Sequence, residues 1–441
     1  MTTSRGRRTA RAGLAAGTSA VVLASCGVGA NPVMNPELSE GEVTITVNWW
    51  GADARTQQTL EALELFEEEY PNISVEPQYS DWTGYWDRMA TTTAAGDMAD
   101  VSQFDQLYLA SYAERGALMD LATVTNILDL SALGENVLDT GRVGDALFAV
   151  PTGATTNGIL INTTLFERHG VPLPDTADWT WDEFESAAIE LTEASGGEVN
   201  GVSPFGGDSF SLTTWARQHG DQLFDADGEV AIDPATLAAY WERELDLIDS
   251  GAAPSAGHLS EVQGLPLDQT DLVTGRTAMG FIPAGQFVSY QSAAPDFDYA
   301  LANWPTDPDT SEGFQYLKPT MYWAAASTSE HPAEAALLLD FLTNDTRVAE
   351  LFGLDRGEPA NPAFREAVEP LLDEPGRESL AFTEAMSEEV GPTPPITPNG
   401  ASHIENLLVR YNQQVLFDDA TPQEAADDLL NELRDSINAA G

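Results

Sequence analysis

The chain has 441 residues, 42% hydrophobic and 20% charged, which is the composition of a folded protein with two or three domains or two large lobes. Acidic residues outnumber basic ones by 71 to 19, so the formal net charge is −52. A surface this acidic argues against nucleic acid and anionic membranes as partners, because both are bound through basic patches, and it makes an anionic ligand less favourable.

The first 25 residues have the pattern of an export signal. Four arginines and no acidic residue precede the apolar run Leu14–Ala24, which is too short to anchor the chain in a bilayer. The single cysteine, Cys26, follows Leu23-Ala24-Ser25 and cannot form an internal disulfide. This stretch resembles the lipobox of bacterial lipoproteins. It predicts removal of residues 1–25, lipidation of Cys26 and a flexible tether over residues 26–41; a cleavable soluble signal is the alternative.

Strand and helix patterns alternate through the first third of the remaining chain. Val43–Trp50 is a short apolar run rich in β-branched residues, which predicts a buried strand, and Arg55–Tyr70 carries apolar residues at helical spacing. The elements expected next are a strand at Ile73–Tyr79, a helix at Trp82–Ala95, a strand at Asp100–Phe104 and a helix at Leu107–Arg115. This alternation predicts an α/β fold with mostly parallel sheets, which place ligands at the carboxyl ends of their strands.

The rhythm continues to the C-terminus. The expected strands are Ala146–Val150, Gly158–Ile161, Thr277–Ile282, Tyr299–Asn303 and Met321–Ala326. The expected helices are Thr180–Ala194, Pro234–Ser250, Pro332–Leu342, Ser402–Leu416 and Pro422–Ala439. Thr180 and Glu183 have the spacing of a capping box, and the proline-rich segment Gly391–Asn399 is expected to be a loop.

Several short motifs, in their order and spacing, resemble extracellular solute-binding protein family 1, the sugar-binding lipoproteins of bacterial ABC importers that are similar to maltose-binding protein. The motifs are Val43–Gly51, Phe66–Val75, Ala95–Val101, Tyr112–Leu121, Gly158–Thr163, Asp178–Phe184, Gly275–Gly280, Met321–Leu342 and Pro422–Ile437. Two positions depart from the family: Ala99 stands where proline is usual, and Gln286 or Phe287 where tryptophan is frequent.

The resemblance implies a two-lobed fold of the periplasmic-binding-protein type II class, with a ligand cleft between the lobes and closure by hinge bending. The chain is expected to pass between the lobes near Pro151, Ile282 and Asn344. The first lobe would then contain residues 42–150 and 283–343, and the second lobe residues 151–282 and 344–441.

A sugar site is expected to combine aromatic planes, which cover the C–H face of a pyranose, with polar side chains that bind its hydroxyls. The candidate ligand-binding residues are Trp49, Trp50, Tyr85, Asp105, Asn157, Asp208, Trp215, Trp304, Tyr322, Trp323 and Arg356. Trp50, Trp215 and Trp323 are the expected sugar platforms, and Arg356 is expected to donate a pair of hydrogen bonds to sugar hydroxyls. For each aromatic residue, packing in a lobe core is the alternative.

The predicted function is capture of a neutral sugar or oligosaccharide at the outer face of the cell membrane by a lipid-anchored, monomeric receptor. Its partners would be the permease subunits of an ABC importer and, through them, an ATPase. No catalytic residue, cofactor or metal site is expected, since the five histidines are scattered and hydrolase and P-loop motifs are absent. The alternatives are a receptor for a polyol, glycerol phosphate or metal complex and, less favoured, an exported glycosidase.

Overall fold

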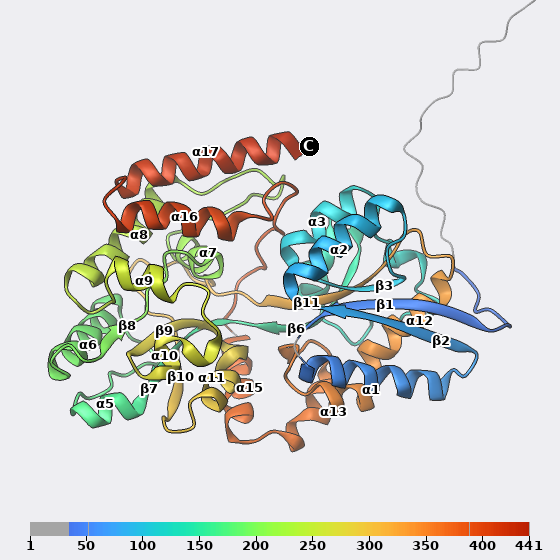
Figure 1. The fold of residues 1–441 in the computed structure, drawn as a ribbon, viewed down its shortest axis with the longest axis horizontal. Helices are drawn as coiled ribbons and strands as arrows, with labels where there is room; N and C mark the ends of the chain where they lie inside the picture. Colours follow the sequence, from blue (N-terminus) through green and yellow to red (C-terminus); the bar gives the residue numbers. More distant parts are fainter. Residues whose placement is uncertain (1–34, 52, 388, 441) are drawn as a thin grey trace, which may run out of the picture. The chain divides into compact units, whose positions relative to one another are not determined.

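The computed structural model describes residues 35–51, 53–387 and 389–440 (Figure 1). The expected signal peptide and Cys26 lie outside these residues. No helix in the described ranges is long and apolar enough to cross a membrane.

Two mixed sheets organise the chain. The first has the strand order β12-β6-β11-β3-β1-β2, and the second has the order β10-β7-β9-β8. The strands of the first sheet are β1 Val43–Trp50, β2 Ile73–Ser80, β3 Val101–Phe104, β6 Ala149–Thr155, β11 Lys318–Ala325 and β12 Glu358–Pro359. The second sheet contains β7 Asn157–Asn162, β8 Asn200–Val202, β9 Thr277–Pro283 and β10 Tyr299–Ala302, and a separate short hairpin pairs β4 Arg142–Val143 with β5 Ala146–Leu147.

Helices cover both faces of the first sheet. In Figure 1, α1 and α13 lie on one face and α2 and α3 on the other, and each face has its own buried cluster of apolar side chains. The helices of this lobe are α1 Asp53–Glu69, α2 Trp82–Ala95, α3 Gln106–Glu114, α4 Glu135–Leu138, α12 Pro332–Asn344, α13 Thr346–Phe352 and α14 Pro362–Val368. We call this sheet with its helices the first lobe.

The second lobe is built in the same way around the smaller sheet. Its largest core contains five tryptophans: Trp179, Trp181, Trp215, Trp241 and Trp304. Its helices are α5 Thr163–His169, α6 Trp181–Ala194, α7 Ser209–Gln218, α8 Pro234–Asp249, α9 Ala256–Val262, α10 Asp271–Thr274, α11 Phe287–Ala293, α15 Glu374–Ser387, α16 Ile404–Leu416 and α17 Pro422–Ala440. The expected capping box at the start of α6 is present, with Thr180 and Glu183 each bonded to the other's backbone N–H.

The α/β class and the two lobes are as predicted, but the sheets are not mostly parallel. β1 pairs in parallel with β2 and β3, and β8 with β9, whereas β3–β11, β6–β11, β6–β12, β7–β9 and β7–β10 are antiparallel. In the first sheet every antiparallel pair involves β6 or β11, the strands at the crossings between the lobes, and in the second sheet both involve β7.

The lobe boundaries also differ from those expected. The chain leaves the first sheet at Thr156, returns between Ala302 and Lys318, and leaves again between Val368 and Glu374. Residues 283–302, expected in the first lobe, belong to the second, because β10 pairs with β7. Residues 346–368, expected in the second lobe, belong to the first, because α13 and α14 bury apolar side chains in its core.

Candidate functional site

A pocket of about 720 Å³ lies between the two lobes, which is within the usual range for small-molecule sites. The first lobe contributes α3 and the turn at residues 139–144, and the second contributes the start of α7, the turn at residues 223–228 and the proline-rich loop at residues 393–398. Tyr316, Pro319 and Tyr322, at and beside the crossing strand β11, and Ile404 of α16 complete the lining. The pocket therefore occupies the place where a hinged two-lobed protein would enclose a ligand.

Four aromatic side chains line this pocket: Phe210, Phe224, Tyr316 and Tyr322. The rings of Phe210 and Tyr316 meet edge to face with their centroids 5.4 Å apart, and the Tyr322 hydroxyl donates to the backbone oxygen of Thr140 at 2.8 Å. Burial raises the pKa of both tyrosines well above the usual value, so both hydroxyls keep their protons. These rings supply rigid apolar surface in a pocket whose lining is part polar and part apolar.

Acidic residues outnumber basic ones in the lining. Glu114, Asp139, Asp225 and Asp227 contribute carboxylates, and Arg142 contributes the one guanidinium. That guanidinium is already paired, with its Nε 3.0 Å from Asp139 Oδ1 and its Nη2 3.0 Å from a Glu135 oxygen. The pocket therefore presents net negative charge, which favours a neutral or cationic ligand over an anionic one.

A group of charged side chains, with Glu405 and Lys318 half-buried and Asp208 exposed, supports the pocket wall beside Phe210. Asp208 caps α7 by accepting a hydrogen bond from the Ser211 N–H at 2.6 Å, and the Ser209 hydroxyl donates to Glu405. The pKa of Glu405 is raised to about 7, mainly by burial and secondly by the negative charge of Asp208. Lys318, the chain's sole lysine, opposes that shift and places its Nζ 5.6 Å from the Phe210 ring centroid.

Few of the residues predicted from the sequence reach this pocket. Tyr322 lines it directly. Asp105 and Asp208 do not line the pocket themselves. They cap the N-termini of α3 and α7 and so position the next residues, Gln106 and Ser209, which do line it. Burial raises the pKa of Asp105, and the charge of Lys318 partly offsets this. Asn157 is buried at the start of β7, where its backbone oxygen accepts from Gln315 at 3.0 Å.

Trp50 and Tyr85 belong to an aromatic cluster beside α3. The Trp50 ring centroid lies 5.2 Å from that of Tyr85 and 5.0 Å from that of the partly exposed Trp82. Tyr85 is held in place because its hydroxyl contacts Asn48 and the backbone oxygen of Gln103. The cluster sits at the carboxyl ends of β1 and β3, the edge that the sequence predicted for ligands, but it does not line the interlobe pocket.

The other five candidates are buried, each 3% exposed or less, and do not line the interlobe pocket: Trp49, Trp215, Trp304, Trp323 and Arg356. Trp49 and Trp50 show why, since adjacent side chains of a strand point to opposite faces and pack in different clusters. Trp215 lies inside the second-lobe core, where its indole N–H donates to the backbone oxygen of Thr236 at 3.0 Å. The platforms expected from Trp215 and Trp323 are thus corrected to packing positions.

Sequence reasoning missed the residues that make most of the lining. Phe210 lies two positions after the candidate Asp208, and Lys318, the chain's sole lysine, lies at the start of the crossing strand. Both features are visible in the sequence and could have pointed to the site. The turn at residues 139–144 and the loop at residues 393–398 have no sequence feature that points to a site, because only the fold brings these two segments together. Among the described residues, no group of three or more His, Cys, Asp or Glu side chains is placed to hold a metal ion.

Comparison with known proteins places this geometry in a family. Residues 51–347, more than half of the chain, match the model of the bacterial extracellular solute-binding protein family. A binding protein of Brucella abortus is 24% identical over 341 residues, covering 75% of this chain and 76% of that protein.

Two solved structures are similar over 90% of this chain, each at 22% identity. One is the periplasmic oligogalacturonide-binding protein of Yersinia enterocolitica in complex with saturated digalacturonic acid, with a TM-score of 0.77 and 100% of that chain covered. The other is an ABC substrate-binding protein of Listeria monocytogenes in complex with cycloalternan, with a TM-score of 0.73 and 99% covered. The family match, the two lobes and the pocket between them agree: the chain belongs to the bacterial extracellular solute-binding proteins.

Proposed function

We propose that this protein binds a neutral oligosaccharide in the pocket between its lobes and delivers it to an ABC importer. The observation that carries the proposal is the lining of the interlobe pocket, where four aromatic rings stand among hydroxyl, amide and carboxylate side chains. Sugars need both kinds of surface, because their C–H faces pack on aromatic rings and their hydroxyls require polar partners. Relatives of the same fold bind digalacturonic acid and cycloalternan, which supports an oligosaccharide as the ligand class.

The charge of the pocket supports a neutral ligand over a uronic acid. A uronide would place its carboxylate among Glu114, Asp139, Asp225 and Asp227, with only the paired Arg142 to offset them. The same carboxylates favour the binding of a neutral sugar, because each one accepts charge-assisted hydrogen bonds from sugar hydroxyls. Ser209, Thr213 and Gln106 add neutral partners.

We assign direct ligand contact to Tyr322 and Phe210, and positioning roles to Asp105 and Asp208. The aromatic cluster around Trp50 and Trp82 is a candidate extension of the site for a longer oligosaccharide, since it lies beside α3 at the carboxyl edge of the first sheet.

The proposed role is transport, without chemical change of the sugar. The mature protein would be anchored at the outer face of the membrane by a lipid on Cys26, act as a monomer and dock on the permease subunits of the importer. A glycosidase would use two carboxyl groups on either side of the scissile bond, and it would release shortened sugars from a bound oligosaccharide. A binding protein returns the sugar intact, which chromatography of the recovered ligand distinguishes.

The test is a screen of neutral and uronic oligosaccharides by thermal shift, followed by calorimetric titration of the best ligand. Gln106→Ala removes a pocket side chain on α3, and we expect it to weaken binding about tenfold, the value of one or two lost hydrogen bonds. Gln57→Ala is the matched control, because Gln57 is exposed on α1 and does not line the pocket. Preference for uronic over neutral sugars, or equal binding by both variants, would contradict the proposal.

A further inference from the structure

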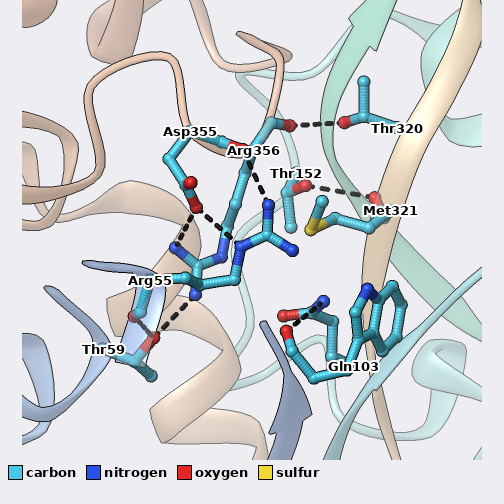
Figure 2. Close-up of polar contacts among 9 residues, drawn as sticks. Arg55, Thr59, Gln103, Thr152, Thr320, Met321, Asp355 and Arg356 are labelled. Atoms are coloured by element: carbon cyan, nitrogen blue, oxygen red, sulfur yellow. Dashed lines mark hydrogen bonds and ion pairs between the residues drawn. The ribbon is translucent and has the colours of Figure 1, made fainter. Parts of the chain in front are cut away.

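A second set of polar side chains lies in the core of the first lobe, outside the interlobe pocket. At its centre is Arg356, which is 3% exposed and follows α13 in a tight turn. Figure 2 shows its guanidinium reaching Thr59, to which Nη2 donates at 2.7 Å. Its Nε and Nη1 have no hydrogen-bond acceptor among the described residues. The guanidinium packs over the Phe352 ring, 3.9 Å from its centroid, but two of its three nitrogens donate no hydrogen bond to a described residue.

The charge of Arg356 is not balanced by the neighbouring carboxylate. Asp355 Oδ2 lies 3.7 Å from Arg356 Nη1 but only 2.7 Å from Arg55 Nε (Figure 2). Arg55 Nη2 also donates to the Asp355 backbone oxygen at 3.0 Å. Two guanidinium groups thus share one carboxylate, which leaves one excess positive charge. The pKa of Arg356 is lowered to about 9, mainly by burial and secondly by the positive charge of Arg55. An uncompensated buried charge is strongly unfavourable and calls for a counter-charge.

A cavity of about 20 Å³ adjoins this guanidinium, enough for one water molecule or one small ion. Trp323 also lines it, and the indole Nε1 of Trp323 is a second buried donor without a partner among the described residues. The other polar side chains there donate elsewhere: Thr152 to the Met321 oxygen at 3.1 Å, and Asn361 to the Thr343 oxygen at 2.9 Å. The uncommitted N–H groups at this cavity therefore come from Arg356 and Trp323.

We propose that this cavity binds one small monovalent anion, chloride under physiological conditions, between Arg356 and Trp323. An anion accepts from several N–H donors at once and also supplies the missing negative charge, whereas a water molecule supplies no charge. The single excess positive charge calls for a monovalent anion rather than a divalent one such as sulfate. The proposal does not depend on the identity of the transported ligand.

The position of this anion site gives it a structural consequence. The Arg356 backbone oxygen accepts from Thr320 on β11, and the following strand β12 pairs with β6 at Gly153 and Ala154. The turn that contains Arg356 is thus hydrogen-bonded to β11 and leads directly into β12, which pairs with β6. β6 and β11 are the two strands that pass between the lobes. Occupancy of the cavity would stabilise the first lobe where it meets the interlobe crossing.

The direct test is a crystal of the wild-type protein soaked in sodium bromide, with anomalous diffraction measured at the bromine edge. We expect an anomalous peak within hydrogen-bonding distance of Arg356 Nε and Trp323 Nε1. A featureless cavity, or a water molecule with no anomalous signal, would overturn the proposal. This measurement needs no variant, so it holds whether or not the substituted proteins fold.

The solution test compares melting temperatures in sodium chloride and in sodium gluconate at equal concentration. Both salts screen the acidic surface equally, but gluconate is too large for the cavity, so we expect a higher melting temperature in chloride. Trp323→Phe keeps the packing and removes one donor to the anion, so the apparent chloride affinity should fall about tenfold. Arg347→Gln, which removes an exposed arginine of the same lobe, should respond like the wild type. Identical wild-type melting in the two salts would overturn the proposal.

Discussion

Glu358 is a carboxyl group that should make the protein less stable as the pH rises towards neutrality. It lies in β12, is 4% exposed and accepts from the Ser379 hydroxyl of α15 at 3.3 Å. Burial raises its pKa from 4.5 to about 8, against the opposing effects of Thr383, Ser379 and Arg365. In the folded protein the group therefore keeps its proton at pH 7, whereas in the unfolded chain it has lost it.

The direction and size of the effect follow from this difference. Between pH 4.5 and about 8 the folded state binds one proton more than the unfolded state, so the free energy of unfolding falls with rising pH over that window and levels off above it. At about 1.4 kcal/mol for each tenfold change in proton affinity, the complete loss is at most about 5 kcal/mol. Glu358→Gln has nearly the same shape and no titration, so it should remove this contribution.

The assay is urea unfolding of the wild type and of Glu358→Gln at a series of pH values from 5 to 9, at fixed salt. The difference between the two profiles isolates Glu358 from the other acids, and the variant should gain several kcal/mol relative to the wild type as the pH rises. Glu350→Gln removes the same charge at an exposed position of α13 and should show no such divergence. Parallel profiles for the wild type and Glu358→Gln would refute the assignment of a neutral buried carboxyl.

Three further predictions concern the core, the surface and the anchor. Trp215 is a core residue, so Trp215→Ala should cost about 3–5 kcal/mol of folding stability in urea unfolding. The sugar affinity of the folded variant should be nearly unchanged. A loss of affinity without a loss of stability would instead assign Trp215 to the binding site. The melting temperature should rise steeply from about 0.01 to 1 M NaCl, as the Debye length falls from about 30 to 3 Å and the net charge of −52 is screened; a flat curve would contradict a role for self-repulsion. Cys26→Ala should release the protein from the membrane fraction or block its processing, and unchanged fractionation and mass would exclude lipidation at Cys26.

The local pattern of the chain predicted most of the first lobe. The strand at Val43–Trp50 has the expected bounds, and the helix at Trp82–Ala95 begins and ends at the expected residues. Both depend on side-chain periodicity and on breaking residues within about 15 positions, which the sequence displays directly. α7 was not predicted, because Thr213 and Thr214 are β-branched and lower its helix propensity, and tertiary packing decides its conformation.

Long-range pairing explains what could not be predicted. The lobe boundaries depend on β10 pairing with β7 and on α13 packing in the first lobe, and neither leaves a local mark in the sequence. The site was mispredicted for a related reason. Tryptophans at strand ends were good candidates by position, but the face of the sheet that each one occupies decides what it packs against: neighbouring Trp49 and Trp50 lie in two different core clusters, and neither lines the pocket.

The most direct test of the proposed function is a crystal structure of the protein with its tightest-binding oligosaccharide. We expect an intact, neutral sugar in the interlobe pocket, in contact with Phe210 or Tyr322 and hydrogen-bonded to groups from both lobes. A sugar bound outside this pocket, a cleaved sugar, or a uronic acid bound more tightly than every neutral oligosaccharide tested would contradict the account.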